Sequence, residues 1–170
     1  MRDHFMAELR RLPLGDAHSH TLLDYFAAAF IYCGRPPITS NHPQNYINFD
    51  MKYCELFEWR HNGVGTVYIK NFQVEDFSKL YQACGTCPAM TRKVVQSAIR
   101  AKGRGLALAG IMAKNGDTAT FTNIQVDSKV SYICQRYNDG AGTSKAGQYT
   151  AKENGDGTQC KYSTSNIQMI

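Results

Sequence analysis

The stretch at residues 99–117, IRAKGRGLALAGIMAKNGD, constrains the fold most. It fits two incompatible structures, and the choice between them decides how the neighbouring segments are interpreted. As a strand over 106–112, it would end at an Asn-Gly pair, which is typical of a β-hairpin turn. The run holds one β-branched residue, however, and that composition disfavours a strand. A helix over 104–115 would begin after a glycine-rich basic turn and end at Asn115-Gly116, a common C-terminal signal. We therefore predict a helix.

The elements around this helix occur in an order that suits phosphate binding. Paired valines favour a strand over 92–99, and a glycine-rich turn covers 100–105. A strand over 119–126 and a helix over 128–137 follow. Glycines let backbone N–H groups approach an anion, and a helix N-terminus adds positive potential. The sequence therefore predicts a phosphate-binding turn at 100–105.

Positive charge is concentrated around the same turn, in a chain whose formal net charge is +5. No acidic residue occurs from Phe77 to Gly116. The basic residues of this block are Lys79, Arg92, Lys93, Arg100, Lys102, Arg104 and Lys114. A block of one sign indicates a polyanion nearby, either nucleic acid or the phosphates of a cofactor. A solvated basic face is the alternative.

The other segments predict a mixture of helices, strands and loops. Apolar residues at helical spacing predict helices over 4–12, 21–33 and 74–85. A strand-like run around the turn His61-Asn62-Gly63 predicts a β-hairpin over 52–72. Short strands are expected over 147–152 and 159–164.

Length and composition indicate one globular domain over residues 1–170. Hydrophobic residues make up 43% of the chain and charged residues 19%, which is ordinary for a folded domain. No apolar run approaches the ~20 residues that a membrane helix needs. The first residues lack the apolar core of a signal peptide, so we expect a cytoplasmic protein with no membrane partner.

The six cysteines give little support to a metal or redox site. Cys84 and Cys87 form the single CxxC, and no histidine follows His61. A zinc site would need distant ligands, and a thioredoxin-like role would need a proline opposite the motif, whereas none follows Pro88. We expect buried or inert thiols. In a secreted protein, Cys134 and Cys160 could form a bridge.

The segment Arg100-Ala-Lys-Gly103-Arg-Gly105 resembles the Arg/Gln-x-x-Gly-x-Gly/Ala signature of the GNAT acyltransferase superfamily, which binds acetyl-CoA. The predicted order over residues 52–137 is similar to that family's core. The resemblance implies an α/β fold (mixed α+β) with a central, mostly antiparallel twisted sheet flanked by helices. It also implies a CoA-dependent N-acyltransferase that moves an acetyl or other acyl group from acyl-CoA to an amine acceptor. An acidic acceptor such as tRNA or DNA would suit the basic block.

The same resemblance assigns residues to the cofactor and to catalysis. The residues implied to bind acyl-CoA are Val94, Val95, Arg100, Ala101, Lys102, Gly103, Arg104, Gly105 and Leu106. Tyr137 takes the position from which the family protonates the leaving thiolate, although a core aromatic would show the same pattern. Glu55 and Glu58 are the candidates for the base, with exposed strand carboxylates as the alternative.

A basic nucleic-acid-binding or metal-dependent nucleic-acid-acting protein without CoA chemistry is the second hypothesis. The segment GDAHSHTLLD resembles the Asp-x-His-x-His metal motif of amidohydrolases, and its His-x-His is similar to that of single-strand nucleases. The amidohydrolase barrel takes roughly 250 residues, which exceeds this chain. We therefore expect no metal site and interpret His18 and His20 as a capping or surface pair.

Overall fold

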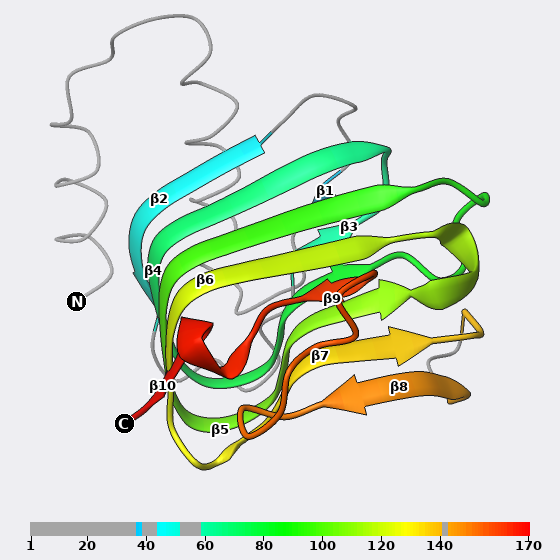
Figure 1. Ribbon diagram of the computed structural model, residues 1–170. Coiled ribbons are helices and arrows are strands. Elements are labelled where there is room, and N and C mark those ends of the chain that lie inside the picture. Colours follow the sequence, from blue (N-terminus) through cyan, green and yellow to red (C-terminus); the bar gives the residue numbers. More distant parts are fainter. Residues whose placement is uncertain (1–36, 39–43, 52–58, 141–142) are drawn as a thin grey trace, which may run out of the picture. The chain divides into compact units, whose positions relative to one another are not determined.

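The computed structural model describes residues 37–38, 44–51, 59–140 and 143–170, and almost all of its regular structure is strand (Figure 1). The strands are β1 (Pro37–Ile38), β2 (Gln44–Met51), β3 (Trp59–His61), β4 (Gly65–Ala83), β5 (Arg92–Met112), β6 (Thr118–Val126), β7 (Val130–Tyr137), β8 (Lys145–Tyr149), β9 (Cys160–Lys161) and β10 (Ile167–Met169). Two single 3₁₀ turns, η1 (Ala113–Asn115) and η2 (Thr164–Asn166), interrupt them. Residues 33–170 form one compact unit.

Successive strands pair in parallel and in register, so the chain winds as a coil. Val67 of β4 pairs with Val94 of β5, which pairs with Ala119 of β6. Figure 1 shows β4, β5 and β6 following one another as successive turns. Among the described strands, only β7 and β8 pair antiparallel. Parallel pairing between successive turns of one coil defines a parallel β-helix.

Residues with positive φ bend the long strands at matching positions of each turn. Asn71, Ala98 and Asn123 have φ of 51°, 53° and 53°, and they lie at equivalent points of β4, β5 and β6. Asp76 and Gly103 form a second bend. These bends divide the coil into three walls, each a sheet of parallel strands except where β8 joins the third wall antiparallel to β7. The first wall holds 65–70, 93–97, 118–122 and β9; the second holds 72–75, 99–102, 124–126 and β10; the third holds 77–83, 105–112, 130–137, β3 and β8.

The core is built of rows in which similar side chains stack from turn to turn. One row runs through Val67, Val94, Ala119 and Cys160, all with exposed fractions of 0%. Apolar residues also fill the row of Phe72, Ile99 and Ile124. Burial of such rows in every turn stabilises the coil at about 25 cal/mol per Å² of apolar surface. The position of a residue within its turn of the coil therefore decides whether its side chain lies in the core.

The predicted helix over 104–115 is wrong, because residues 104–112 continue β5. Its small residues suit the interior of a coil. Gly103 has φ of 63°, and an added Cβ there would lie 3.0 Å from Cγ of Asp76. An added Cβ at Gly105 would lie 2.6 Å from Cε1 of Phe77. Contacts with the neighbouring turn thus outweigh the weak strand propensity of this sequence.

The predicted α/β fold with an antiparallel sheet flanked by helices is also wrong. The sheet is parallel, and the segments predicted as helices over 74–85 and 128–137 lie largely in β4 and β7. The β-hairpin is wrong too, since β3 pairs in parallel with β4. Strands over 92–99 and 119–126 are confirmed. The helices predicted over 4–12 and 21–33 lie outside the described residues. In the described part of the chain, no helix is both long and apolar enough to cross a membrane.

Candidate functional site

The outer side of the third wall carries a row of four polar residues and one glycine, one from each neighbouring strand. The register joins Arg60, Gln82, Gly110, Gln135 and Gln148. We call these five residues the polar row. Neighbouring positions in such a row are about 4.8 Å apart. The row therefore brings a guanidinium and several amides together from distant parts of the chain.

Gly110 gives the polar row its shape because it has no side chain. An added Cβ would meet Oε1 of Gln82 and would lie 3.2 Å from Cε2 of Tyr137. The Gln82 amide thus lies over the Gly110 backbone and close to the Tyr137 ring. Any larger residue at 110 would displace one of these two side chains.

Lys79 is held beside the row by an aromatic ring. Its Nζ lies 5.0 Å from the centroid of the Tyr137 ring, a distance typical of a cation–π interaction. The Tyr137 hydroxyl donates a hydrogen bond to Oε1 of Gln135. The lysine ammonium is thereby positioned over a ring whose own orientation is fixed by the polar row.

Several amide atoms of the row have no hydrogen-bond partner. They are Oε1 of Gln82, Nε2 of Gln135 and Nε2 of Gln148. Buried polar groups are nearly always hydrogen-bonded in folded proteins, so unpaired ones call for an explanation. Amide donors and acceptors next to a cation can bind the hydroxyl and carboxylate groups of a ligand.

A hydrogen-bonded pair inside the coil supports the third wall. His61 is 1% exposed, and a hydrogen bond of 2.8 Å joins its Nδ1 to the Tyr81 hydroxyl. Burial and the nearby Arg92 charge lower the pKa of His61 to about 4. Burial raises the pKa of Tyr81. Both groups are therefore neutral near pH 7 and act as structural partners.

Arg92 and Asp117 connect the turns next to this pair. The Asp117 carboxylate accepts hydrogen bonds from the backbone N–H groups of Arg92, at 2.8 Å, and Met112, at 3.0 Å. Burial raises the pKa of Asp117, while these two hydrogen bonds oppose the rise. The Arg92 guanidinium, 0% exposed, donates to the carbonyls of Met90 and Asn62. These contacts fix the turn that leads from the third wall to the first.

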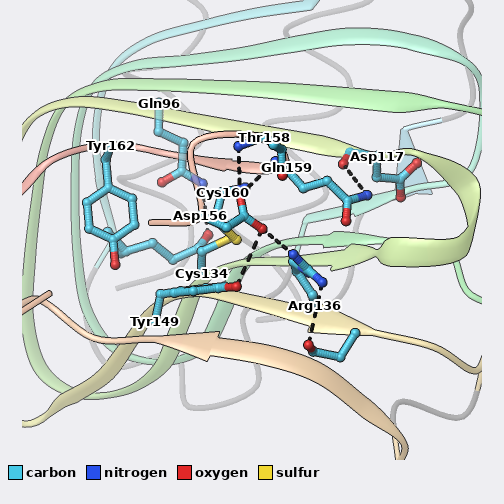
Figure 2. The surroundings of a disulfide bond; sticks show 12 residues. Gln96, Asp117, Cys134, Arg136, Tyr149, Asp156, Thr158, Gln159, Cys160 and Tyr162 are labelled. Carbon is cyan, nitrogen blue, oxygen red and sulfur yellow. Dashed lines mark hydrogen bonds and ion pairs between the residues drawn. A yellow bond between two sulfur atoms is a disulfide. The ribbon is translucent and has the colours of Figure 1, made fainter. Parts of the chain in front are cut away.

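Disulfides join all four cysteines of the described residues 59–140 and 143–170, so the prediction of inert thiols is wrong for them. Cys84 and Cys87 close the turn after β4, and Cys134 is bonded to Cys160 (Figure 2). The second bond crosses the interior, from the third wall to the first. It therefore ties the wall that carries the polar row to the opposite side of the coil.

Asp156 organises the loop beside this disulfide. Its Oδ1 accepts hydrogen bonds from the backbone N–H groups of Thr158, Gln159 and Cys160, and Oδ2 forms an ion pair with Arg136 (Figure 2). Burial opposes ionisation, but the ion pair and the N–H donors lower the pKa of Asp156 to about 2. The carboxylate therefore holds the loop against the last turn of the coil.

The residues predicted to bind acyl-CoA lie on β5, in no helix-opening turn. Val94 and Ala101 point into the core, whereas Val95 is half-buried on the outer side. Arg100, Lys102, Arg104 and Leu106 are exposed. The N–H of Gly103 donates to Asp127, that of Arg104 to Asp76, and that of Gly105 to the Lys129 carbonyl. These three N–H groups therefore bind groups of the chain itself and do not form the predicted turn at a helix N-terminus.

Of the predicted catalytic residues, only Tyr137 lies within the described chain, and it adjoins the polar row. Glu55 and Glu58 lie outside the described residues, as do His18 and His20. Within the described ranges, no group of three or more His, Cys, Asp or Glu side chains could hold a metal ion.

Sequence reasoning did not single out Arg60, Gln82 or Gln135, and it counted Lys79 only within the basic block. Their positions share no local spacing that predicts a common site. A parallel register over successive turns is the signal that would have grouped them, and it becomes visible only once the coil is known.

A family model described as "Pectate lyase" matches residues 59–144, which include most of the polar row. "Probable pectate lyase E" of Aspergillus fumigatus is 38% identical over 104 residues, covering 61% of this chain and 39% of that protein. "Pectate lyase H" of Emericella nidulans is 43% identical over 100 residues, covering 58% of this chain and 38% of that protein. The chain thus spans about two fifths of the length of these relatives.

One solved structure shows the same fold. Pectate lyase PelI from Erwinia chrysanthemi, in complex with tetragalacturonic acid, matches with a TM-score of 0.59 and 17% identity, over 81% of this chain and 48% of that one. Together with the family match, this contradicts the GNAT resemblance, N-acyltransferase activity and acetyl-CoA as co-substrate. Nothing supports an amine acceptor or a nucleic-acid partner, so those predictions are wrong as well.

Proposed function

The chain belongs to the pectate lyase family, and we propose that its polar row binds an acidic polysaccharide of the pectate type and breaks it by elimination. The solved neighbour with this fold was obtained with tetragalacturonic acid, a chain of sugar acids. Such a polymer carries a carboxylate on every sugar. The net charge of +5 favours its approach to this chain.

Elimination places definite demands on a site. A base removes the proton from the ring carbon next to the carboxylate, a carbon–carbon double bond forms, and the bond to the leaving sugar oxygen breaks. That oxygen takes up a proton, and no water is consumed. Because charge develops on the carboxylate as the proton leaves, a cation beside it stabilises the transition state.

Lys79 has the chemistry required of the base. A carboxylate in that role would repel the anionic substrate, and an arginine side chain does not release its proton in proteins. An amine can lose a proton and then accept one from the sugar. The Tyr137 ring holds Nζ of Lys79 at 5.0 Å from its centroid. Tyr137 is therefore a positioning residue in this proposal.

Arg60 supplies the substrate contact in this proposal, and the amides support the ring that holds Lys79. Arg60 donates a hydrogen bond of 3.5 Å to the Thr86 hydroxyl and stands at the end of the polar row. A guanidinium binds a carboxylate through two parallel hydrogen bonds. Gln135 is 0% exposed and the unpaired amide atoms of Gln82 and Gln135 are buried, so in this proposal these amides surround and orient the Tyr137 ring. The lysine held on a ring beside these unpaired amides is the observation that carries the proposal.

The test measures turnover of polygalacturonate by the ultraviolet absorbance of the unsaturated product. We expect Lys79→Met to lower the rate by at least about 100-fold, since general-base catalysis contributes that much or more. The assay is run with Ca²⁺ and with a chelator, because oxygen-rich polymers bind this cation and its presence changes their charge.

Lys102→Met is the matched control, because Lys102 is an exposed lysine on the second wall. It should keep a rate within about twofold of the unmodified chain. Absence of unsaturated product from the unmodified chain under every condition would overturn the proposed function. Equal rate losses in the two variants would overturn the role of Lys79.

A further inference from the structure

The outer side of the first wall differs from the polar row in carrying lysines on a sheet of hydroxyl groups. Lys70 of β4, Lys93 of β5 and Lys161 of β9 all point away from the core, since they alternate with buried residues. We call these three residues and the threonines between them the lysine face. It belongs to no part of the site described above.

Charge on the lysine face is of one sign. Among the described outward residues of 65–70, 93–97, 118–122 and β9, none is acidic. Lys93 and Lys161 are exposed and Lys70 is half-buried. Within the described residues, no ion pair joins any of the three to a carboxylate. Their charges are therefore available to an external anion.

Hydroxyl groups fill most of the positions between the lysines, and Val95 is an apolar residue among them. Thr66 and Thr118 flank Lys93 in one row, and Thr120 lies beside Lys161 in the next. Neighbouring strands are about 4.8 Å apart, and alternate residues along a strand are about 6.8 Å apart. The three lysines thus stand roughly 10–15 Å from one another on a regular polar surface.

An aromatic ring completes the surface. Tyr68 is half-buried in the row of Thr120 and Lys161, and Nζ of Lys70 lies 5.2 Å from the centroid of its ring. An amphipathic ring beside cations and hydroxyls suits a sugar acid, whose apolar ring face and carboxylate it can contact together.

We propose that the lysine face is a second binding surface for the acidic polysaccharide, apart from the polar row. This inference rests on the proposed function for its ligand class. The lysine charges complement the carboxylates of the polymer, and the hydroxyl rows offer hydrogen bonds along it. The surface lies on the first wall and the polar row on the third, so one long polymer can contact either without occupying the other.

The experiment measures the affinity of the full chain for long polygalacturonate by titration calorimetry. All proteins carry Lys79→Met, so that the polymer is not consumed. The triple variant Lys70→Gln/Lys93→Gln/Lys161→Gln is compared with Lys102→Gln/Lys114→Gln/Lys152→Gln. The control removes the same charge from exposed positions elsewhere. We expect about five- to tenfold weaker binding for the first triple and less than a twofold change for the second.

Equal weakening in both triples would assign the effect to net charge and overturn the proposal, as would unchanged affinity in the first triple. Loss of binding to DNA without loss of binding to polygalacturonate would overturn the ligand class. If the triple variant does not fold, Lys93→Gln/Lys161→Gln carries the same test, since both residues are exposed. The proposed function is tested separately, by turnover of polygalacturonate by the unmodified chain. The binding experiment measures affinity alone, which does not depend on catalysis, so the two proposals can fail independently.

Discussion

The third wall and the first wall use the same strands, β4 and β5, to present different chemistry. On the third wall, Lys79 is held by the Tyr137 ring beside amides that are largely buried. On the first wall, Lys93 and Lys161 are exposed on a plain hydroxyl surface. Burial and fixed geometry favour catalysis, because a reacting group must stay in place. Dispersed exposed charge favours loose attraction of a polymer.

Removal of the bond between the two walls should have the largest effect on stability. The Cys134–Cys160 disulfide closes a sequence separation of 26 residues, and its loss is expected to lower the free energy of unfolding by about 3 kcal/mol. Denaturant titration of Cys134→Ala/Cys160→Ala measures this loss. Cys84→Ala/Cys87→Ala, with a separation of 3, should lose less. A larger loss in the second variant would show that the turn matters more than the connection between walls.

Acidification should weaken the third wall at a defined pH. His61 has a pKa of about 4 in the folded chain against 6.5 when exposed, so the unfolded state binds its proton first. The contribution of neutral His61 to the free energy of unfolding is therefore complete above pH 6.5 and is lost as the pH falls towards 4. The loss amounts to about 2 kcal/mol after allowance for solvent screening.

Thermal denaturation across this pH range measures the effect. The groups facing His61 are Tyr81 and the Arg92 charge, and they are unchanged in His61→Gln. That variant should show a shallower loss of stability between pH 6.5 and 4. Parallel curves for the two proteins would mean that another group titrates there.

The smallest expected effect on stability comes from adding a side chain at Gly110, the residue of the polar row that has none. Gly110→Ala forces the flexible Gln82 amide or the Tyr137 ring to move, at about 1 kcal/mol of stability. Adding Gln82→Ala should recover most of that loss, because the clashing atom is removed. Differential scanning calorimetry of the single and double variants tests this. Failure of the second substitution to rescue would place the strain at Tyr137.

Sequence patterns predicted strands where β-branched residues are dense, as in 92–99 and 119–126. They failed at 104–112, where alanine and glycine are selected by contact with the adjacent turns, such as Phe77 against Gly105. Tyr137 was proposed as a catalytic residue for an activity that the family match contradicts. Its contact with Lys79 joins β7 to β4 and could not have been predicted from local spacing. Its hydrogen bond to Gln135 spans two residues of one strand and becomes predictable only once residues 130–137 are known to form a strand.

By itself, the sequence determined the basic block and the strand potential of the valine-rich segments. The tertiary structure alone decided which of these side chains meet. Parallel register pairs residues a whole turn of the coil apart, so Arg60, Gln82 and Gln135 become neighbours although no local period relates them. Local propensity acts over a few residues, whereas the polar row depends on stacking between turns.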